Sequence, residues 1–211
     1  MIKNWNEVSV GTYAEILKVC EREEPEDVEI GIVAILCGKS EEEVLKMNIT
    51  DYQVLRKDAQ FVASFPPIRA KCPKTVTLHG RKYEVVNDVR KMTAGEYIDF
   101  QTFSKMDLEK TVVEVLSCFL VPEGMTYGEY DLTEVYDDIR EDLPVVVAYE
   151  MCAFFLSRLT LLTKATLSYS ERMMRKMMRK TKDKEMKERI KESLTKIQEA
   201  RTKINGVGLN A

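Results

Sequence analysis

The chain has 211 residues, of which 45% are hydrophobic and 32% charged, with nine glycines and six prolines. This composition can bury a real core and favours helices over a β-sandwich or a flexible linker. Its five scattered cysteines are odd in number, which excludes a closed disulfide framework. Four of them lie in apolar helical patterns and are expected to be buried thiols of a reducing compartment: Cys20, Cys37, Cys118 and Cys152.

The net charge of −3 conceals an uneven distribution of charge along the chain. Residues 164–211 contain 14 Lys or Arg against 6 Asp or Glu, whereas residues 1–163 contain 18 against 29. An acidic body with a basic tail indicates charge pairing within or between chains, or an anionic partner for the tail.

The sequence does not favour a membrane protein. The first eight residues lack the apolar core of a signal peptide. The most apolar stretch, residues 145–162, is interrupted by Glu150 and Arg158. A charge near the centre of a spanning helix costs about 2.5 to 3.5 kcal/mol. We therefore expect a buried core helix in this stretch and no association with a membrane.

Two segments repeat the same helix-starting pattern 84 residues apart. Residues 8–13 read V-S-V-G-T-Y and residues 92–97 read M-T-A-G-E-Y, each with a hydroxyl N-cap after an apolar residue. Each copy predicts a helix, a short acidic connection and a second apolar helix, which together form a helical hairpin. The shared register favours duplication over chance, as in the pairs Ile16 with Phe100, Ile32 with Leu116, Leu36 with Leu120, and Gly38 with Pro122.

Between the two copies, the sequence predicts two short helices and a β-hairpin. Capping boxes at residues 40–43 and 50–53 start the helices, the second of which ends before Pro66. Residues 75–86 then alternate apolar and polar side chains around Gly80, which is typical of a hairpin. One face would carry Val76, Leu78, Tyr83 and Val85. An isolated hairpin is marginally stable, so it must pack on helices or pair with the edge of another chain.

After the second copy, the chain is predicted to be helical. Asp131, followed by Glu134, caps one helix, and Asp142 caps a long one with Pro144 in its first turn. The chain remains strongly helix-forming from Ser170 to Ile204 and becomes basic. Its methionines form one apolar face: Met173, Met174, Met177 and Met178.

These patterns divide the chain into four parts. They are an N-terminal helical segment (1–66), a β-hairpin connector (67–91), a second helical segment (92–165) and a basic C-terminal helix (166–211). The predicted fold is mainly α: two related helical-hairpin segments flanking a small β-hairpin, with a long C-terminal helix.

The sequence contains no pattern typical of catalysis, of a cofactor site or of a metal site. Its one histidine, His79, lies beside the turn glycine Gly80 and is expected to be an exposed turn residue. The sequence has no second histidine to complete a metal site and no pair of cysteines at metal-ligand spacing. It also has no glycine-rich phosphate loop. Acidic clusters lie at helix starts and connections, where they favour the helix dipole. We therefore predict a protein that is not an enzyme and binds no cofactor or metal.

Two surfaces are predicted to contact other chains. The first is the hairpin face defined above, and the second is the methionine face with its neighbours Arg175, Lys176, Arg179 and Lys180. Methionine faces flanked by basic residues bind varied partners, and basic helices bind phosphates. We favour a helix–helix contact over nucleic acid, because acidic residues are interspersed in the tail and no aromatic residue follows Tyr169 to stack on bases.

Three stretches carry a resemblance to a known group. They are W-N-E-V-S-V-G-T-Y-A-E-I (5–16); G-R-K-Y-E-V (80–85) with K-M-T-A-G-E-Y-I-D-F (91–100); and F-L-V-P-E-G-M-T-Y (119–127) with E-V-Y-D-D-I-R-E-D-L-P (134–144). They resemble small proteins of tailed bacteriophages, especially the crAss-like phages of gut Bacteroidetes. The resemblance covers about residues 5–165 and consists of caps, turns and packing positions. It therefore implies a scaffold used in virion morphogenesis and carries over no catalytic residue.

The leading hypothesis is a non-enzymatic phage structural or assembly protein, multimeric in the portal–tail region of the virion. Its partners would be other phage structural proteins and copies of itself, in the virion or in the host cytoplasm during assembly. One alternative is a soluble tail-assembly chaperone that binds an apolar partner segment. Another is a nucleic-acid or packaging factor that acts through the basic tail.

Overall fold

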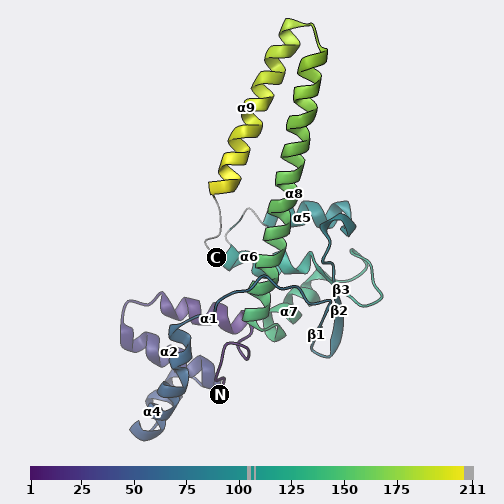
Figure 1. Ribbon diagram of the computed structural model, residues 1–211. Coiled ribbons are helices and arrows are strands. Elements are labelled where there is room, and N and C mark those ends of the chain that lie inside the picture. The colour runs from purple at the N-terminus through teal and green to yellow at the C-terminus, as the bar shows by residue number, and fades with distance from the viewer. Residues whose placement is uncertain (104–105, 107, 207–211) are drawn as a thin grey trace. The chain divides into compact units, whose positions relative to one another are not determined.

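The computed structural model describes residues 1–103, 106 and 108–206 of the chain. The fold is mainly helical, as the sequence predicts, and contains a small three-stranded antiparallel sheet (Figure 1). The chain divides into two compact units, Met1–Phe155 and a second that begins at Leu156. The first three predicted parts thus lie almost entirely within the first unit. Residues 207–211, at the end of the fourth part, lie outside the described residues.

The first unit begins with a helical hairpin formed by α1 (Val10–Cys20) and α2 (Pro25–Cys37). The predicted cap is confirmed, because the Ser9 hydroxyl accepts a hydrogen bond from the Thr12 amide. The two helices cross closely at Gly31, where an added Cβ would lie 2.6 Å from Cγ1 of Val19. A side chain on this residue would therefore push α2 away from α1.

The next elements are α3 (Glu41–Leu45), α4 (Ile49–Asp58) and the 3-10 helix η1 (Ala59–Ala63). The capping box of residues 40–43 is present, with both of its hydrogen bonds formed. The box predicted at residues 50–53 is wrong. Asn48 caps α4 instead, since its side chain accepts a hydrogen bond from the Asp51 amide at 2.9 Å.

A hydrophobic cluster joins the N-terminal segment to these helices. Trp5 is buried against Phe61 and Phe65, and its indole nitrogen donates to the Ser64 carbonyl at 2.8 Å. The start of the chain is thereby tied to the segment that follows η1. The buried members of this cluster are Trp5, Val8, Ile16, Val33, Ala34, Leu36, Val44, Ala59 and Val145.

The predicted β-hairpin is confirmed and gains a third strand. Strands β1 (Thr75–Leu78) and β2 (Arg81–Val85) pair antiparallel, with Val76 opposite Tyr83. β3 (Leu120–Pro122) pairs with the other edge of β2. The repeat predicts that Leu120 ends an apolar helix, which is wrong, because a short apolar run has no period that distinguishes a strand from a helix.

The second helical segment contains η2 (Val89–Lys91), α5 (Ala94–Phe103) and α6 (Leu108–Ser117). Its capping box is confirmed, with Thr93 and Glu96 bonded to each other's amides. Thr93 caps α5 as Ser9 caps α1, 84 residues earlier, and the repeat pair Ile16 and Phe100 is buried in both copies. The copies differ at their ends, because α2 continues to Cys37 whereas α6 ends at Ser117 and leads into β3. Repeat positions 104, 105 and 107 lie outside the described residues.

α7 (Leu132–Asp142) and the start of α8 (Val145–Lys180) complete the first unit. Asp131 caps α7 as predicted, through a bond from the Thr133 amide. The core helix predicted for residues 145–162 is confirmed only as far as Phe155, because no residue from 156 to 162 is buried. The buried residues at its start are Val145, Ala148, Met151, Cys152 and Phe155. The Phe155 ring stacks on the Phe119 ring in this core.

The cysteine prediction holds for two of its four residues. Cys118 and Cys152 are buried, and burial raises the pKa of each thiol to about 12. Cys37 is partly buried. The expectation for Cys20 is wrong: it is exposed because it is the last residue of α1, beyond the buried stripe of that helix.

The second unit is a helical hairpin made of the remainder of α8 and of α9 (Lys184–Gly206). The predicted helical C-terminal segment is confirmed, with an interruption at residues 181–183 that the sequence did not predict, where Asp183 accepts a hydrogen bond from the Glu185 amide. α9 runs back along α8 (Figure 1), and Arg201 pairs with Glu171 at 3.3 Å.

Among the described helices, α8 is long and apolar enough to cross a membrane by length and composition. A single helix of this kind is weak support for a membrane protein, because the core helix of a soluble protein meets the same criteria.

Candidate interaction site

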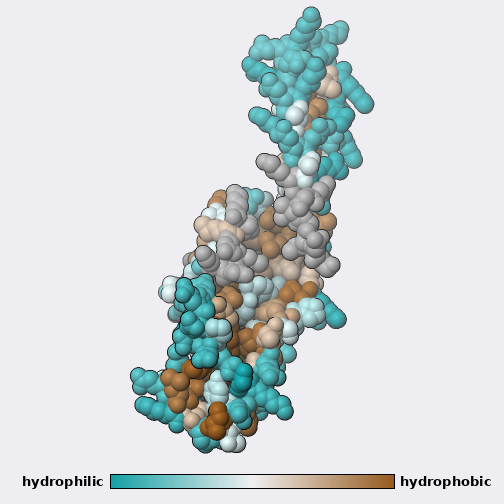
Figure 2. All heavy atoms as spheres, turned by 90° about the vertical axis from the view of Figure 1, so that its left-hand side faces the viewer, coloured by the Kyte–Doolittle hydropathy of each residue, from teal (hydrophilic) through white to brown (hydrophobic). Residues whose placement is uncertain are grey.

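Hydrophobic patches lie within a hydrophilic surface at the lower end of Figure 2, where α2 and α4 face the viewer. Leu45, at the end of α3, and Ile49, at the start of α4, are each 66% exposed. Exposed apolar patches with a polar rim mark sites of contact with other molecules.

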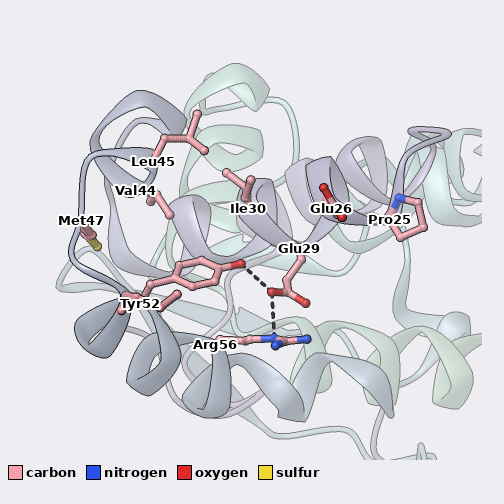
Figure 3. Close-up of a pocket in the computed structure, with 10 residues that line it drawn as sticks. Pro25, Glu26, Glu29, Ile30, Val44, Leu45, Met47, Tyr52 and Arg56 are labelled. Carbon is pink, nitrogen blue, oxygen red and sulfur yellow. Dashed lines mark hydrogen bonds and ion pairs between the residues drawn. The ribbon is translucent and has the colours of Figure 1, made fainter.

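A groove between α2, α3 and α4 lies beside these two residues (Figure 3). Its volume is about 590 Å³. Its apolar lining consists of Pro25, Ile30, Val44, Leu45, Met47 and Ile49, and its polar lining of Glu26, Glu29, Tyr52 and Arg56. We name this feature the α2–α4 groove.

Local sequence explains why the groove forms. α3 has only five residues, and the Asn48 cap starts α4 three residues after Leu45. Val44 points into the core and is 2% exposed, whereas its neighbour Leu45 and the first residue of α4, Ile49, are left outside. In the five-residue helix α3 only Val44 points toward the core, so the apolar side chains beside it face solvent.

The polar wall of the groove joins α2 to α4. The Glu29 carboxylate accepts a hydrogen bond from the Tyr52 hydroxyl at 2.5 Å and pairs with Nε of Arg56 at 2.8 Å (Figure 3). Burial, together with the neighbouring Glu29, raises the pKa of Tyr52 to about 12, so its hydroxyl remains a donor at neutral pH. These three side chains satisfy one another and fix the spacing of the two helices.

The surroundings of the groove are acidic. Residues 21–58 contain eleven Asp or Glu against five Lys or Arg. Among these acids, Glu41 pairs with Arg22, and the Glu43 carboxylate accepts a hydrogen bond from the Ser40 amide. The excess negative charge nevertheless sets the sign of the local potential, which favours a basic ligand.

The predicted hairpin face does not provide a surface for a partner. Leu78, Tyr83 and Val85 are buried within the chain, and Val76 is half-buried. The Tyr83 hydroxyl donates to Asp138 of α7, and β3 occupies the second edge of β2. The apolar face of the hairpin therefore belongs to the core of the first unit, because other elements of the same chain cover it.

His79 has a structural role that sequence reasoning missed. It adopts a positive φ of 48° at the exposed hairpin tip, and its ring nitrogen Nδ1 lies 3.1 Å from Asp138. Its amide donates to Asp142 at 2.7 Å. Asp142 is the last residue of α7 and α8 begins at Val145, so the prediction that Asp142 caps α8 is wrong. The hydrogen bond with Asp138 raises the pKa of His79, and the charges of Asp142 and Glu141 add to this effect. The cluster of acidic residues at 137–142 was the sequence feature that could have indicated a partner for His79.

The four methionines of the predicted face in the second unit differ in their exposure to solvent. Met173 and Met177, one turn apart on α8, are 40% and 48% exposed, whereas Met174 and Met178 are half-buried. Met173 and Met177 are thus the more accessible part of the predicted face of four methionines. Lys176, Arg179 and Lys180 are exposed beside the outer pair, and Arg175 pairs with Glu171 at 2.7 Å. We name this basic, Met-bearing end of α8 (residues 172–180) the α8 tip.

A second hollow, of about 650 Å³, lies between α1, α6 and α7 in the first unit. Its lining includes Tyr13, Leu17, Val113, Arg140 and Tyr149. It lacks the strongly exposed apolar rim that Leu45 and Ile49 give the α2–α4 groove. The groove is therefore the stronger candidate for contact with another molecule.

Within the described part of the chain, His, Cys, Asp and Glu side chains form no group arranged to hold a metal ion. No protein-family model, curated protein or solved structure matches this chain.

Proposed function

We propose that this chain is a non-enzymatic structural or assembly protein of a tailed bacteriophage and acts as a multimer in the portal–tail region. The observation that carries the proposal is that the chain exposes two apolar surfaces, one with acidic surroundings and one with basic surroundings. The α2–α4 groove lies in an acidic segment, and the α8 tip is basic. The phage context rests on the sequence resemblance of residues 5–165.

Two such surfaces suit a protein that contacts more than one neighbour. Leaving apolar area in water forgoes about 25 cal/mol for each Å² that a partner would bury. The polar residues of the groove pair with one another across α2 and α4, which gives them a positioning role. Both observations favour binding over chemistry.

The first alternative is a soluble tail-assembly chaperone that holds an apolar partner segment in the groove. It is favoured by Met47 in the lining, because unbranched thioether side chains adapt to varied partners. The second alternative is a nucleic-acid or packaging factor acting through the α8 tip. It requires DNA affinity that falls steeply with added salt.

The test is deletion of the gene from a phage that encodes it, followed by electron microscopy of the particles and mass spectrometry of purified virions. We expect particles with defective or missing tails, and we expect the protein to be present in wild-type virions. A protein that tail formation requires but that mature virions lack would be the chaperone. Normal infectious particles without the gene would overturn the proposal.

A further inference from the structure

We propose that the α2–α4 groove binds the α8 tip of a second copy of this chain, so that copies associate head to tail. This inference rests on the proposed function and deepens it by naming the partner of the groove. It assigns two different surfaces of one chain to a single interface, which is heterologous and leads to a ring or a filament.

Charge complementarity is the first argument. The α8 tip carries five basic residues and no acidic one: Arg172, Arg175, Lys176, Arg179 and Lys180. The segment that forms the groove, residues 21–58, carries a net charge of −6. Surfaces of opposite sign attract each other at long range and disfavour the contacts of groove with groove or tip with tip.

Apolar complementarity is the second argument. Met173 and Met177 are exposed on one side of α8 at a spacing of four residues, which is the spacing of anchors in a helix that binds a groove. The groove offers an apolar floor at Ile30 and Val44 with an exposed apolar rim. Flexible methionine side chains fill irregular hollows well, so a groove of about 590 Å³ suits them.

The arrangement of hydrogen bonds also fits this occupant. The Glu29 carboxylate that faces the groove is engaged by Tyr52 and Arg56, so the groove floor presents no uncompensated charge to an apolar anchor. Glu26, the other acidic residue of the lining, is exposed. Basic residues of the α8 tip would meet this carboxylate at the rim, where water remains accessible.

The experiment compares a groove variant, Leu45→Lys with Ile49→Lys, and a tip variant, Met173→Glu with Met177→Glu. All four positions are exposed, so the substitutions leave the cores intact. Matched controls place the same charges on exposed apolar residues outside the proposed interface: Val54→Lys on α4 and Met186→Glu on α9. The mass of each full-length protein is measured by sedimentation velocity across a range of concentrations.

We expect the wild-type protein and both controls to gain mass with concentration, and this gain to weaken at high salt. Each variant alone should have its dissociation constant raised at least tenfold. An equimolar mixture of the two variants should form dimers and nothing larger, because only one intact groove and one intact tip remain in each pair.

Three outcomes would overturn the inference. They are a wild-type chain that stays monomeric at every concentration, a mixture that fails to form dimers, and a groove variant that loses assembly while the tip variant assembles normally. The third outcome would indicate a symmetric groove-to-groove contact. The proposed function fails separately: it falls if virions assemble without the gene, even when the purified chain associates head to tail.

Discussion

The backbone amide of His79, at the tip of the β-hairpin, donates a hydrogen bond to the Asp142 carboxylate at the end of α7. The same histidine approaches Asp138 through Nδ1 and Glu141 through Nε2. Three acidic side chains of one helix therefore hold the only histidine of the chain and, with it, the turn between β1 and β2. This contact makes the docking of the hairpin depend on pH.

The first prediction concerns that dependence. The pKa of His79 is raised in the folded protein above its ordinary value near 6.5, mainly by the hydrogen bond with Asp138. The stabilisation is therefore fully present below about pH 6.5 and is lost as pH rises through the raised pKa. Because the chain has one histidine, its ring resonance in an NMR titration measures this value directly.

The matching variant is His79→Gln, which keeps a polar side chain and loses the titration. In urea unfolding, its stability should lie closest to that of the wild type near pH 8.5 and furthest below it near pH 6. A measured pKa at or below 6.5 would contradict the assignment.

The second prediction concerns the close crossing of α1 and α2. Gly31→Ala should destabilise the first unit by about 1 to 3 kcal/mol, because the new Cβ meets Val19. Gly95→Ala in α5 is the matched control, since its Cβ would have no heavy-atom contact closer than 3.7 Å. That control should be neutral or slightly stabilising through helix propensity. Fluorescence of Trp5, the only tryptophan, reports unfolding of the first unit.

Shortening the opposing side chain provides a check on this mechanism. Val19→Ala combined with Gly31→Ala should be less destabilised than the sum of the two single changes. Additive effects would show that the crowding of these two residues is not the cause.

The third prediction concerns the aromatic core of the first unit. The Phe119 side chain is fully buried, with Phe155 stacked on its ring and Phe100 at its edge. Phe119→Ala should cost about 3 to 5 kcal/mol in the free energy of unfolding. Leu161→Ala, at an exposed position of α8, should change it by less than about 0.5 kcal/mol. Equal effects in chemical denaturation would refute this description of the core.

The fourth prediction concerns the wall of the α2–α4 groove. Glu29→Ala removes the acceptor of the Tyr52 hydroxyl and the partner of Arg56. We expect a loss of about 1 kcal/mol and faster hydrogen exchange in α4. Tyr52→Phe removes the hydroxyl alone and should have a smaller effect, because the ion pair remains. Unchanged exchange in both variants would mean that the groove does not depend on these bonds.

Local chemistry explains which parts of the fold were predictable. Ser9, Ser40, Thr93 and Asp131 cap helices as expected, because a cap depends on a few adjacent residues. Asp142 does not cap α8 because α7 extends through Asp142 and α8 begins only at Val145. Strand β3 is not predictable from its own residues, since only its pairing with β2 makes it a strand.

The candidate site was less predictable than the fold. The alternation of the hairpin correctly identified one apolar face, yet nothing in a strand pattern says whether other elements of the chain cover it. The groove at Leu45 and Ile49 went unnoticed because these residues lie at the ends of two short helices, outside any periodic stripe. The exposed methionines Met173 and Met177 were predictable as part of a contact surface, because their spacing on α8 follows the helical period.

The bridge between Ser9 and Pro144 has a consequence for the order of folding. Val10 bonds to the Leu143 carbonyl, and the Val145 amide bonds to the Val8 carbonyl. The first strand-like contact of the chain therefore waits for a segment that the ribosome synthesises more than a hundred residues later. A nascent chain that stops before this segment lacks the bond from Val145 to Val8, and the hydrophobic cluster of the N-terminal helices lacks Val145 until synthesis reaches α8.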